Sequence, residues 1–172
     1  FGAIAELVDR AGLFRMGLDK SLRRLVGLPR SAFSTALAHF GLGVTVIGIV
    51  AATAWQLELV TTMPAGTSKT LGEFTVAYNG AKQVQVENYT ADVGDFTISL
   101  KGSADRHLEP ERRVYAASGM PTTEAAIETY GFSQLYVQLG EQGPDGARVV
   151  RVWYKPYVTL IWLGALVMAA AG

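Results

Sequence analysis

The longest uncharged run in the sequence is Ala32–Trp55, which contains no Lys, Arg, Asp or Glu. At about 1.5 Å per residue, a helix of roughly 24 residues would be about 36 Å long and would cross a bilayer core of roughly 30 Å. A second apolar run, Tyr157–Ala171, is short for a complete span, and we expect the chain to stop inside a membrane helix or at its far edge. The pattern therefore predicts a transmembrane helix at 32–55 and a truncated one at 157–172.

Between the two apolar runs, residues 56–156 show the two-residue alternation that is typical of half-buried β-strands. Asn79-Gly80 is a turn signal between two such segments, and Gly140–Gly146 is expected to be the turn of a late hairpin. One segment, Thr123–Glu128, instead suggests one or two helical turns. Six or so short strands over about 100 residues predict a small antiparallel barrel or sandwich. The clearest predicted strands are Glu73–Tyr78, Lys82–Glu87, Phe96–Leu100, Leu135–Leu139 and Arg148–Trp153.

The first 31 residues carry more Lys and Arg than Asp and Glu. Within them, Asp19–Leu25 has the spacing of an amphipathic helix on a membrane surface, and a solvated linker helix is the alternative. Ser31 is expected to be the N-cap of the first span. By the positive-inside rule, residues 1–31 lie in the cytoplasm and residues 56–156 lie across the membrane, in the periplasm of a bacterium. One aromatic belt at the membrane surface would then contain Trp55, Trp153, Tyr154, Tyr157 and Trp162.

Composition narrows the classes of function. The formal net charge is +0 at pH 7, which argues against nucleic-acid binding. The sequence has no Cys, which excludes disulfides, iron–sulfur clusters and thiolate zinc sites within it. The first residue is not Met and no signal-peptide pattern follows it, so we expect the chain to be a piece of a larger membrane protein.

One ionisable side chain, His39, lies within the first apolar run. Ionisable residues at membrane depth are rare and usually mark a functional site. Its helical neighbours include Ala32, Ala36 and Gly43, which are small and leave room for another helix or for a flat ring. Neutral imidazole is a good axial ligand for haem iron, and the carbonyl or hydroxyl of Thr35 lies within one turn to hold the other ring nitrogen. On the residues alone, a histidine hydrogen-bonded across a helix interface explains the pattern equally well.

The other polar features point to less specific roles. His107, the only other histidine, stands in a charged stretch and is expected to be an exposed loop residue. The charged segments Pro110–Tyr115 and Thr123–Ala125 are expected to form surface ion pairs of small energetic worth, or to dock a partner protein. No nucleophile–base pair, phosphate-binding loop or metal cluster is apparent, so catalytic residues stay unassigned. Three glycines of the apolar run indicate helix packing rather than dinucleotide binding: Gly41, Gly43 and Gly48.

Several segments, in order along nearly the whole chain, resemble the C-terminal portion of the bacterial cytochrome c-type biogenesis haem lyase subunit, the CcmF/CycK family. They lie just before and within the first apolar run, in the second apolar run, and in the region between the two. The segments are Leu28–Ser31, Leu37–Gly41, Val46–Val50, Asn88-Tyr89, Pro110–Tyr115, Thr123–Ile127, Leu135–Val137, Arg151–Pro156 and Ile161–Gly164.

The resemblance implies a multi-pass protein of the bacterial inner membrane that attaches haem to apocytochrome c in the periplasm. It also implies a b-type haem held between two transmembrane histidines, with His39 at one of the two positions as an axial ligand of the iron. The second ligand and the tryptophan-rich haem-handling loop belong to earlier parts of the family, so this chain alone is expected to be an incomplete lyase. The implied partners are the haem chaperone CcmE, CcmH/CcmI-type apocytochrome-handling subunits, apocytochrome c and membrane lipid.

Two other interpretations stay open at this point. In the first, a membrane-anchored periplasmic β-domain docks a partner protein without cofactor chemistry, through residues such as Glu111, Arg113 and Glu124. In the second, the chain is a fragment of a transporter or sensor. The second is weaker, because the broken helices and further membrane charges that are typical of transporters are not apparent.

Overall fold

A computed structural model describes residues 29–143 and 145–172. It also describes single residues among the first 28, namely Gly2, Ala5, Val8, Asp9, Gly12, Gly17, Lys20, Ser21 and Gly27. The amphipathic helix predicted at Asp19–Leu25 lies mostly outside the described residues, and it stays a prediction.

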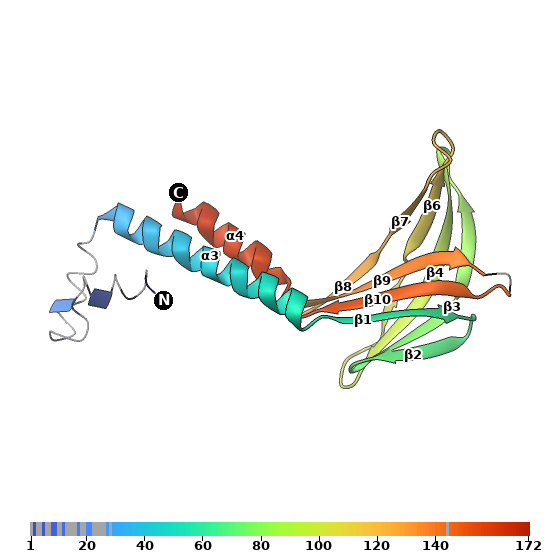
Figure 1. Ribbon diagram of the computed structural model, residues 1–172, viewed down its shortest axis with the longest axis horizontal. Coiled ribbons are helices and arrows are strands. Elements are labelled where there is room, and N and C mark those ends of the chain that lie inside the picture. Colours follow the sequence, from blue (N-terminus) through green and yellow to red (C-terminus); the bar gives the residue numbers. More distant parts are fainter. Residues whose placement is uncertain are drawn as a thin grey trace. The chain divides into compact units, whose positions relative to one another are not determined.

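The chain forms two compact units, one made of residues 1–54 with 157–172 and the other of residues 55–156. The first unit contains α3 (Arg30–Ala54) and α4 (Thr159–Ala171), which Figure 1 shows as two coiled ribbons. With 25 residues, α3 is long and apolar enough to cross a membrane, whereas the 13 residues of α4 are fewer than a complete span needs.

The first apolar helix begins slightly earlier than predicted. Because α3 starts at Arg30, Ser31 lies inside its first turn and the prediction that Ser31 is the N-cap is wrong. Pro29 precedes the helix and its carbonyl accepts a hydrogen bond from the Ala32 amide at 3.0 Å. The fixed φ of proline suits the start of a helix, which explains the earlier boundary.

The two helices pack against each other through glycine. A Cβ built at Gly41 would lie 2.7 Å from the Gly164 carbonyl oxygen, and one at Gly48 would lie 2.8 Å from the Ile161 backbone nitrogen. Thr45 adds a hydrogen bond from its hydroxyl to the Ile161 carbonyl at 3.4 Å. Early residues of α3 therefore meet late residues of α4, so the pair is antiparallel. Such close backbone approach through small residues is how helices pack in membranes, where no water drives association.

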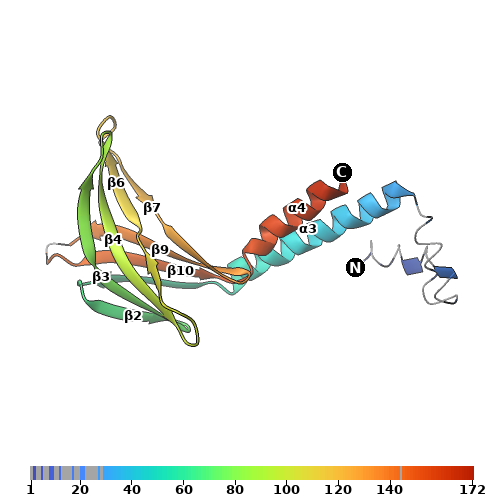
Figure 2. The same ribbon diagram turned by 180° about the vertical axis from the view of Figure 1, so that it is seen from behind.

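The second unit is a β-sandwich, whose two sheets Figures 1 and 2 show from opposite sides. One sheet has the strand order β1-β10-β9-β8, and the other has the order β2-β3-β4-β6-β7 with β5 beside β4. The strands are β1 (Leu57–Met63), β2 (Thr67–Leu71), β3 (Phe74–Gln85), β4 (Tyr89–Leu100), β5 (Arg106–Leu108), β6 (Glu111–Tyr115), β7 (Pro121–Glu124), β8 (Ala126–Tyr130), β9 (Ser133–Gln142) and β10 (Arg148–Lys155). A sandwich is one of the two predicted architectures.

The core lies between the two sheets and comes from alternate residues of each strand. In β9, for example, Leu135, Val137 and Leu139 are fully buried, while the residues between them are partly exposed. Because the chain has no Cys, burial of apolar surface at about 25 cal/mol per Å² is the main stabilising term. The cluster consists of Met63, Leu71, Phe74, Val76, Tyr78, Phe96, Ile98, Leu108, Leu135, Val137, Leu139, Val150 and Val152.

The turn predicted at Asn79-Gly80 is wrong, because β3 runs without interruption through both predicted strands. The register instead shifts between Tyr78 and Gly80, which is a β-bulge, and Gly80 takes a φ of 140° that favours glycine. The real hairpin turn follows Gln85, where the Val86 amide donates to the Tyr89 carbonyl at 2.9 Å. An isolated Gly in a strand pattern thus marks a bulge here.

The helical turns predicted at Thr123–Glu128 are also wrong. This segment contains the end of β7 and the start of β8, and it changes from one sheet to the other at Ala125. Pairing with β6 and β9 decides the conformation, and β-branched Thr and Ile suit strands. The late hairpin is confirmed, but β9 extends to Gln142, so its turn is shorter than predicted.

Candidate functional site

His39 lies in the first half of α3, and its ring is held by its own helix. Nδ1 is 2.7 Å from the backbone carbonyl oxygen of Thr35, one turn earlier. A carbonyl can only accept, so Nδ1 carries the proton and donates it. The lone pair of neutral imidazole is then on Nε2, which is the tautomer that an axial ligand of haem iron needs. The sequence predicted that Thr35 would hold the ring, and the carbonyl does so.

The helix face that carries His39 is not the face that packs on α4. Gly41 is two positions after His39, which places the two residues about 160° apart around a helix with 3.6 residues per turn. The His39 side chain is exposed, and a Cβ built at Gly43, one turn further on, would meet nothing within 4 Å among the described residues. Within this chain, the His39 face of α3 therefore has an unprotonated ring nitrogen and no described residue over Gly43. The residues present fit an axial ligand of haem.

The three glycines of the first apolar run do not share one role. The prediction of helix packing is confirmed for Gly41 and Gly48, which touch α4. For Gly43 the prediction finds no support, since no described residue approaches it. Helical position explains the difference, because Gly43 lies on the His39 side of α3.

His107 lies in the second unit, in the short strand β5 rather than in the predicted loop. It is exposed, as predicted, and its Nδ1 is 3.4 Å from the Thr97 hydroxyl. Nothing in these contacts assigns it a chemical role.

Arg113 of β6 is the centre of the most densely paired charged group on the sandwich. Its Nε is 2.7 Å from a Glu111 carboxylate oxygen and its Nη1 is 3.7 Å from a Glu124 oxygen. The guanidinium also lies over the Tyr89 ring, 5.0 Å from the centroid, and that ring is 5.4 Å from the Tyr115 ring. Hydrogen bonding to Glu111 and then to Tyr115 raises the pKa of Arg113 above its usual value. The predicted surface ion pairs are confirmed. Tyr89 adds an aromatic ring beneath the guanidinium, a cation–π contact that the sequence analysis did not predict.

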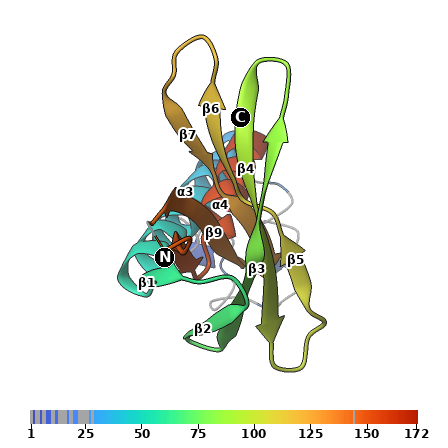
Figure 3. The same ribbon diagram turned by 90° about the vertical axis from the view of Figure 1, so that its right-hand side faces the viewer.

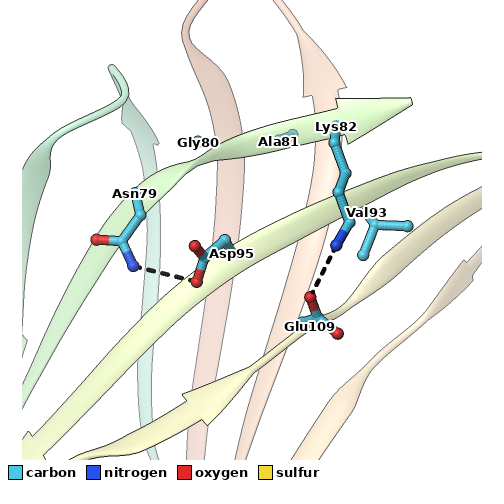
Figure 4. A pocket seen from close by; sticks show the side chains of 7 residues that line it. All are labelled: Asn79, Gly80, Ala81, Lys82, Val93, Asp95 and Glu109. Carbon is cyan, nitrogen blue, oxygen red and sulfur yellow. Dashed lines mark hydrogen bonds and ion pairs between the residues drawn. The ribbon is translucent and has the colours of Figure 1, made fainter. Parts of the chain in front are cut away.

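A shallow pocket of about 200 Å³ lies on the sheet that contains β3 and β4 (Figure 4). The Asn79 amide donates to Asp95 at 3.1 Å and to the Thr97 hydroxyl at 3.0 Å, and the Lys82 ammonium is 3.2 Å from Glu109. Its polar groups are thus paired with one another. Within residues 29–143 and 145–172, no group of three or more His, Cys, Asp or Glu side chains could hold a metal ion.

Comparison with known proteins identifies the family. The family described as CcmF C-terminal beta-sandwich matches residues 54–156. Cytochrome c-type biogenesis protein CycK of Rhizobium meliloti (strain 1021) is 48% identical over 171 residues, which cover 99% of this chain and 25% of that protein. The chain belongs to the CcmF/CycK family and corresponds to its C-terminal portion.

Two further comparisons agree with this CcmF assignment. Cytochrome c-type biogenesis protein CycK of Bradyrhizobium diazoefficiens is 43% identical over 171 residues, which cover 99% of this chain and 26% of that protein. A solved structure of the cytochrome c heme lyase CcmF matches 83% of this chain and 24% of its own chain with a TM-score of 0.71. At 16% sequence identity that likeness shows a shared fold. The chain therefore spans only 25% and 26% of the length of the two CycK proteins.

Proposed function

We propose that His39 is one axial ligand of a b-type haem within a complete CcmF-type haem lyase. The observation that carries the proposal is the hydrogen bond from Nδ1 to the Thr35 carbonyl, which leaves Nε2 as the ligand atom on an open face of α3. The names of the similar proteins support a role in haem handling, since they are cytochrome c biogenesis proteins and a heme lyase. The second ligand would come from a part of the protein that this chain does not include.

The residues around His39 have distinct roles in this proposal. The Thr35 carbonyl keeps the proton on Nδ1. Gly43 has no side chain, so a flat ring could lie close to the helix backbone at that position. The contacts of Gly41 and Gly48 with α4 fix α3, so the imidazole is held by a paired helix rather than by a single one. When bound, the haem would supply one-electron redox chemistry, which could keep the iron of the transferred haem reduced.

The proposal includes a location and partners. α3 would cross the bacterial inner membrane, and residues 55–156 would lie in the periplasm. There the full-length protein would take haem from the haem chaperone CcmE and attach it to apocytochrome c, together with CcmH/CcmI-type subunits. The length and apolar composition of α3 support the membrane crossing.

The test is the absorption spectrum of the purified, reduced full-length protein. We expect His39→Ala to remove most of the b-type haem absorbance, whereas His107→Ala, which changes the other histidine of the chain, should leave it intact. Added imidazole should restore absorbance in His39→Gly, because a free ring can occupy the vacated ligand position. An unchanged b-type signal in His39→Ala would remove the ligand assignment.

A second candidate function is docking of a partner protein through the Arg113 group. The observation that favours it is the convergence of Glu111, Glu124 and Tyr89 on one guanidinium at the surface of the sandwich. The Arg113 and Glu111 side chains are each 27% exposed and the Glu124 side chain is 51% exposed, so a partner protein could reach the group from the solvent side.

Docking is tested by capture of the haem chaperone by the full-length protein. The variants Glu111→Gln and Arg113→Gln should each weaken capture at least fivefold if the group is the contact. Glu58→Gln is the control, because it removes one exposed carboxylate from the other sheet. If all three variants capture the chaperone as well as the unchanged protein does, docking through the Arg113 group is excluded.

A further inference from the structure

The sheet β1-β10-β9-β8 has one end at which the chain both enters and leaves the sandwich. At this end β1 begins, with Leu57 opposite Tyr154, and β10 finishes one residue later at Lys155. Lys155 is opposite Gln134, and the turn that joins β8 to β9 closes at the Tyr130–Ser133 pair. Four strand ends from three separate places in the sequence therefore meet at one edge of the unit.

Three large apolar side chains are exposed at this end, beside the exposed polar residues Gln56 and Glu58, and we call this set of three the apolar rim. It consists of Trp55, Leu57 and Phe132, which are all exposed. Phe132 stands in the turn between β8 and β9 with 54% of its surface exposed. The opposite end of the same sheet exposes Glu141 and Asp145 and, among its described residues, no large apolar side chain. A rim of large apolar side chains at one end only is a feature of a covered surface.

The chain itself indicates what covers the rim. Trp55 directly follows Ala54, the last residue of α3, so their Cα atoms are about 3.8 Å apart. A helix that crosses a bilayer ends at the headgroup layer, where Trp and other aromatic side chains are enriched. Lys155 provides a cation at the same end, and its ammonium lies 5.6 Å from the Tyr136 ring centroid. Aromatic groups with a nearby lysine match the mixed apolar and phosphate chemistry of a lipid surface.

We propose that the apolar rim lies in the headgroup layer of the bilayer, with Phe132 inserted among the upper acyl chains. This inference rests on the proposed crossing of the membrane by α3. The hairpin of β8 and β9 then attaches the sandwich to the membrane at a third point, in addition to the two chain connections. Two connections allow rotation about the line between them, and a third restricts it.

The experiment uses full-length protein in liposomes, with single cysteines labelled by the fluorophore NBD in a background without other cysteines. This chain contributes none to that background. The labelled variants are Phe132→Cys, Ile47→Cys within α3, and Met120→Cys. Met120 is the matched control, since it is apolar and 67% exposed but lies beyond β6, in the β6–β7 hairpin (Figure 3). Each variant is exposed to lipids with a doxyl quencher at acyl carbon 5 or 12, and to iodide in the water.

The rim proposal expects the label at 132 to be quenched at least threefold more by shallow doxyl lipid than the label at 120. Iodide should quench the label at 120 more strongly. If 132 behaves like 120 while 47 is quenched by deep doxyl lipid, the membrane crossing stands and the rim proposal fails. If 47 is not quenched by either lipid, the proposed membrane crossing itself fails. A label at 132 that neither lipid nor iodide quenches would be covered by protein, which also overturns the rim proposal.

Discussion

The Tyr130 side chain combines a well-packed ring with a poorly placed hydroxyl. Its ring is 5.0 Å from the Phe74 ring at an interplanar angle of 59°, an arrangement that aromatic pairs favour. The hydroxyl oxygen is buried, and no described residue offers it a hydrogen bond. Burying a polar group without a partner costs roughly 1–3 kcal/mol. We therefore expect Tyr130→Phe to stabilise the sandwich by about 1 kcal/mol in urea unfolding of the full-length protein at pH 8, and a loss of stability would contradict this.

The same variant should respond to pH in a defined direction. Burial raises the pKa of Tyr130 above its ordinary value. The charge of Glu128 raises this pKa further, and the charge of Arg106 lowers it by less than the other two raise it. The side chain of an unfolded tyrosine has a pKa of about 10, as in model peptides. The stabilising term is thus fully present below about pH 10 and is lost as the pH rises through the folded pKa. Phe cannot ionise, so the advantage of Tyr130→Phe should grow between pH 8 and pH 10.5, and an advantage that stays constant would count against this reading.

Between elements, the tightest contact is the crossing of α3 and α4 at Gly164. A Cβ built there would overlap the Thr45 hydroxyl and the Gly41 carbonyl oxygen. Gly164→Ala must push the helices apart, and overpacking of this kind typically costs about 1–3 kcal/mol. The matched control is Gly43→Ala compared in haem-free protein, where it adds the same methyl group and no described atom lies within 4 Å. Thermal aggregation of the full-length protein in detergent should begin at a lower temperature for Gly164→Ala and not for Gly43→Ala.

Local patterns in the sequence predict elements well where burial is one-sided. The alternation at Leu135–Leu139 predicts β9 because every second residue enters the core, and the uncharged run at 32–55 predicts α3 to within two residues. Local patterns fail where pairing with a strand distant in the sequence decides the secondary structure. β7 is exposed throughout, so its segment has no alternation to read, and only its pairing with β6 makes it a strand.

The candidate site is predictable to a similar extent. Helical spacing is enough to place Thr35 beneath His39, because both lie on one helix. Spacing also suggests that Gly43 packs against a helix, yet which face of α3 meets α4 depends on Gly164, which is more than a hundred residues away. That choice is a property of two helices together, and one helix alone does not contain it.

For the molecule as a whole, the two sheets are joined by charge as well as by the core. Arg148 of β10 and Asp92 of β4 are 2.9 Å apart, and only 9% of the arginine side chain is exposed. Two further pairs also join the two sheets, Arg106 with Glu128 at 3.4 Å and Arg112 with Glu141 at 3.3 Å. In both, one partner is well exposed, so solvent screens them and little stability depends on them.

Asp92→Asn is expected to destabilise the sandwich more than removal of any exposed carboxylate. It would leave the buried Arg148 guanidinium without a counter-charge, and breaking a buried pair by removing one partner typically costs about 3–5 kcal/mol. Asp92 is 20% exposed, so the lower end of that range applies. The control, Glu141→Gln, removes a carboxylate that is 80% exposed and should cost less than about 1 kcal/mol.

Both variants are compared by the rate of amide hydrogen exchange in β4 and β10 of the full-length protein. Because the two strands belong to different sheets, faster exchange in both strands of Asp92→Asn would show that the pair holds the sheets together. Faster exchange in β4 alone would confine its effect to one sheet.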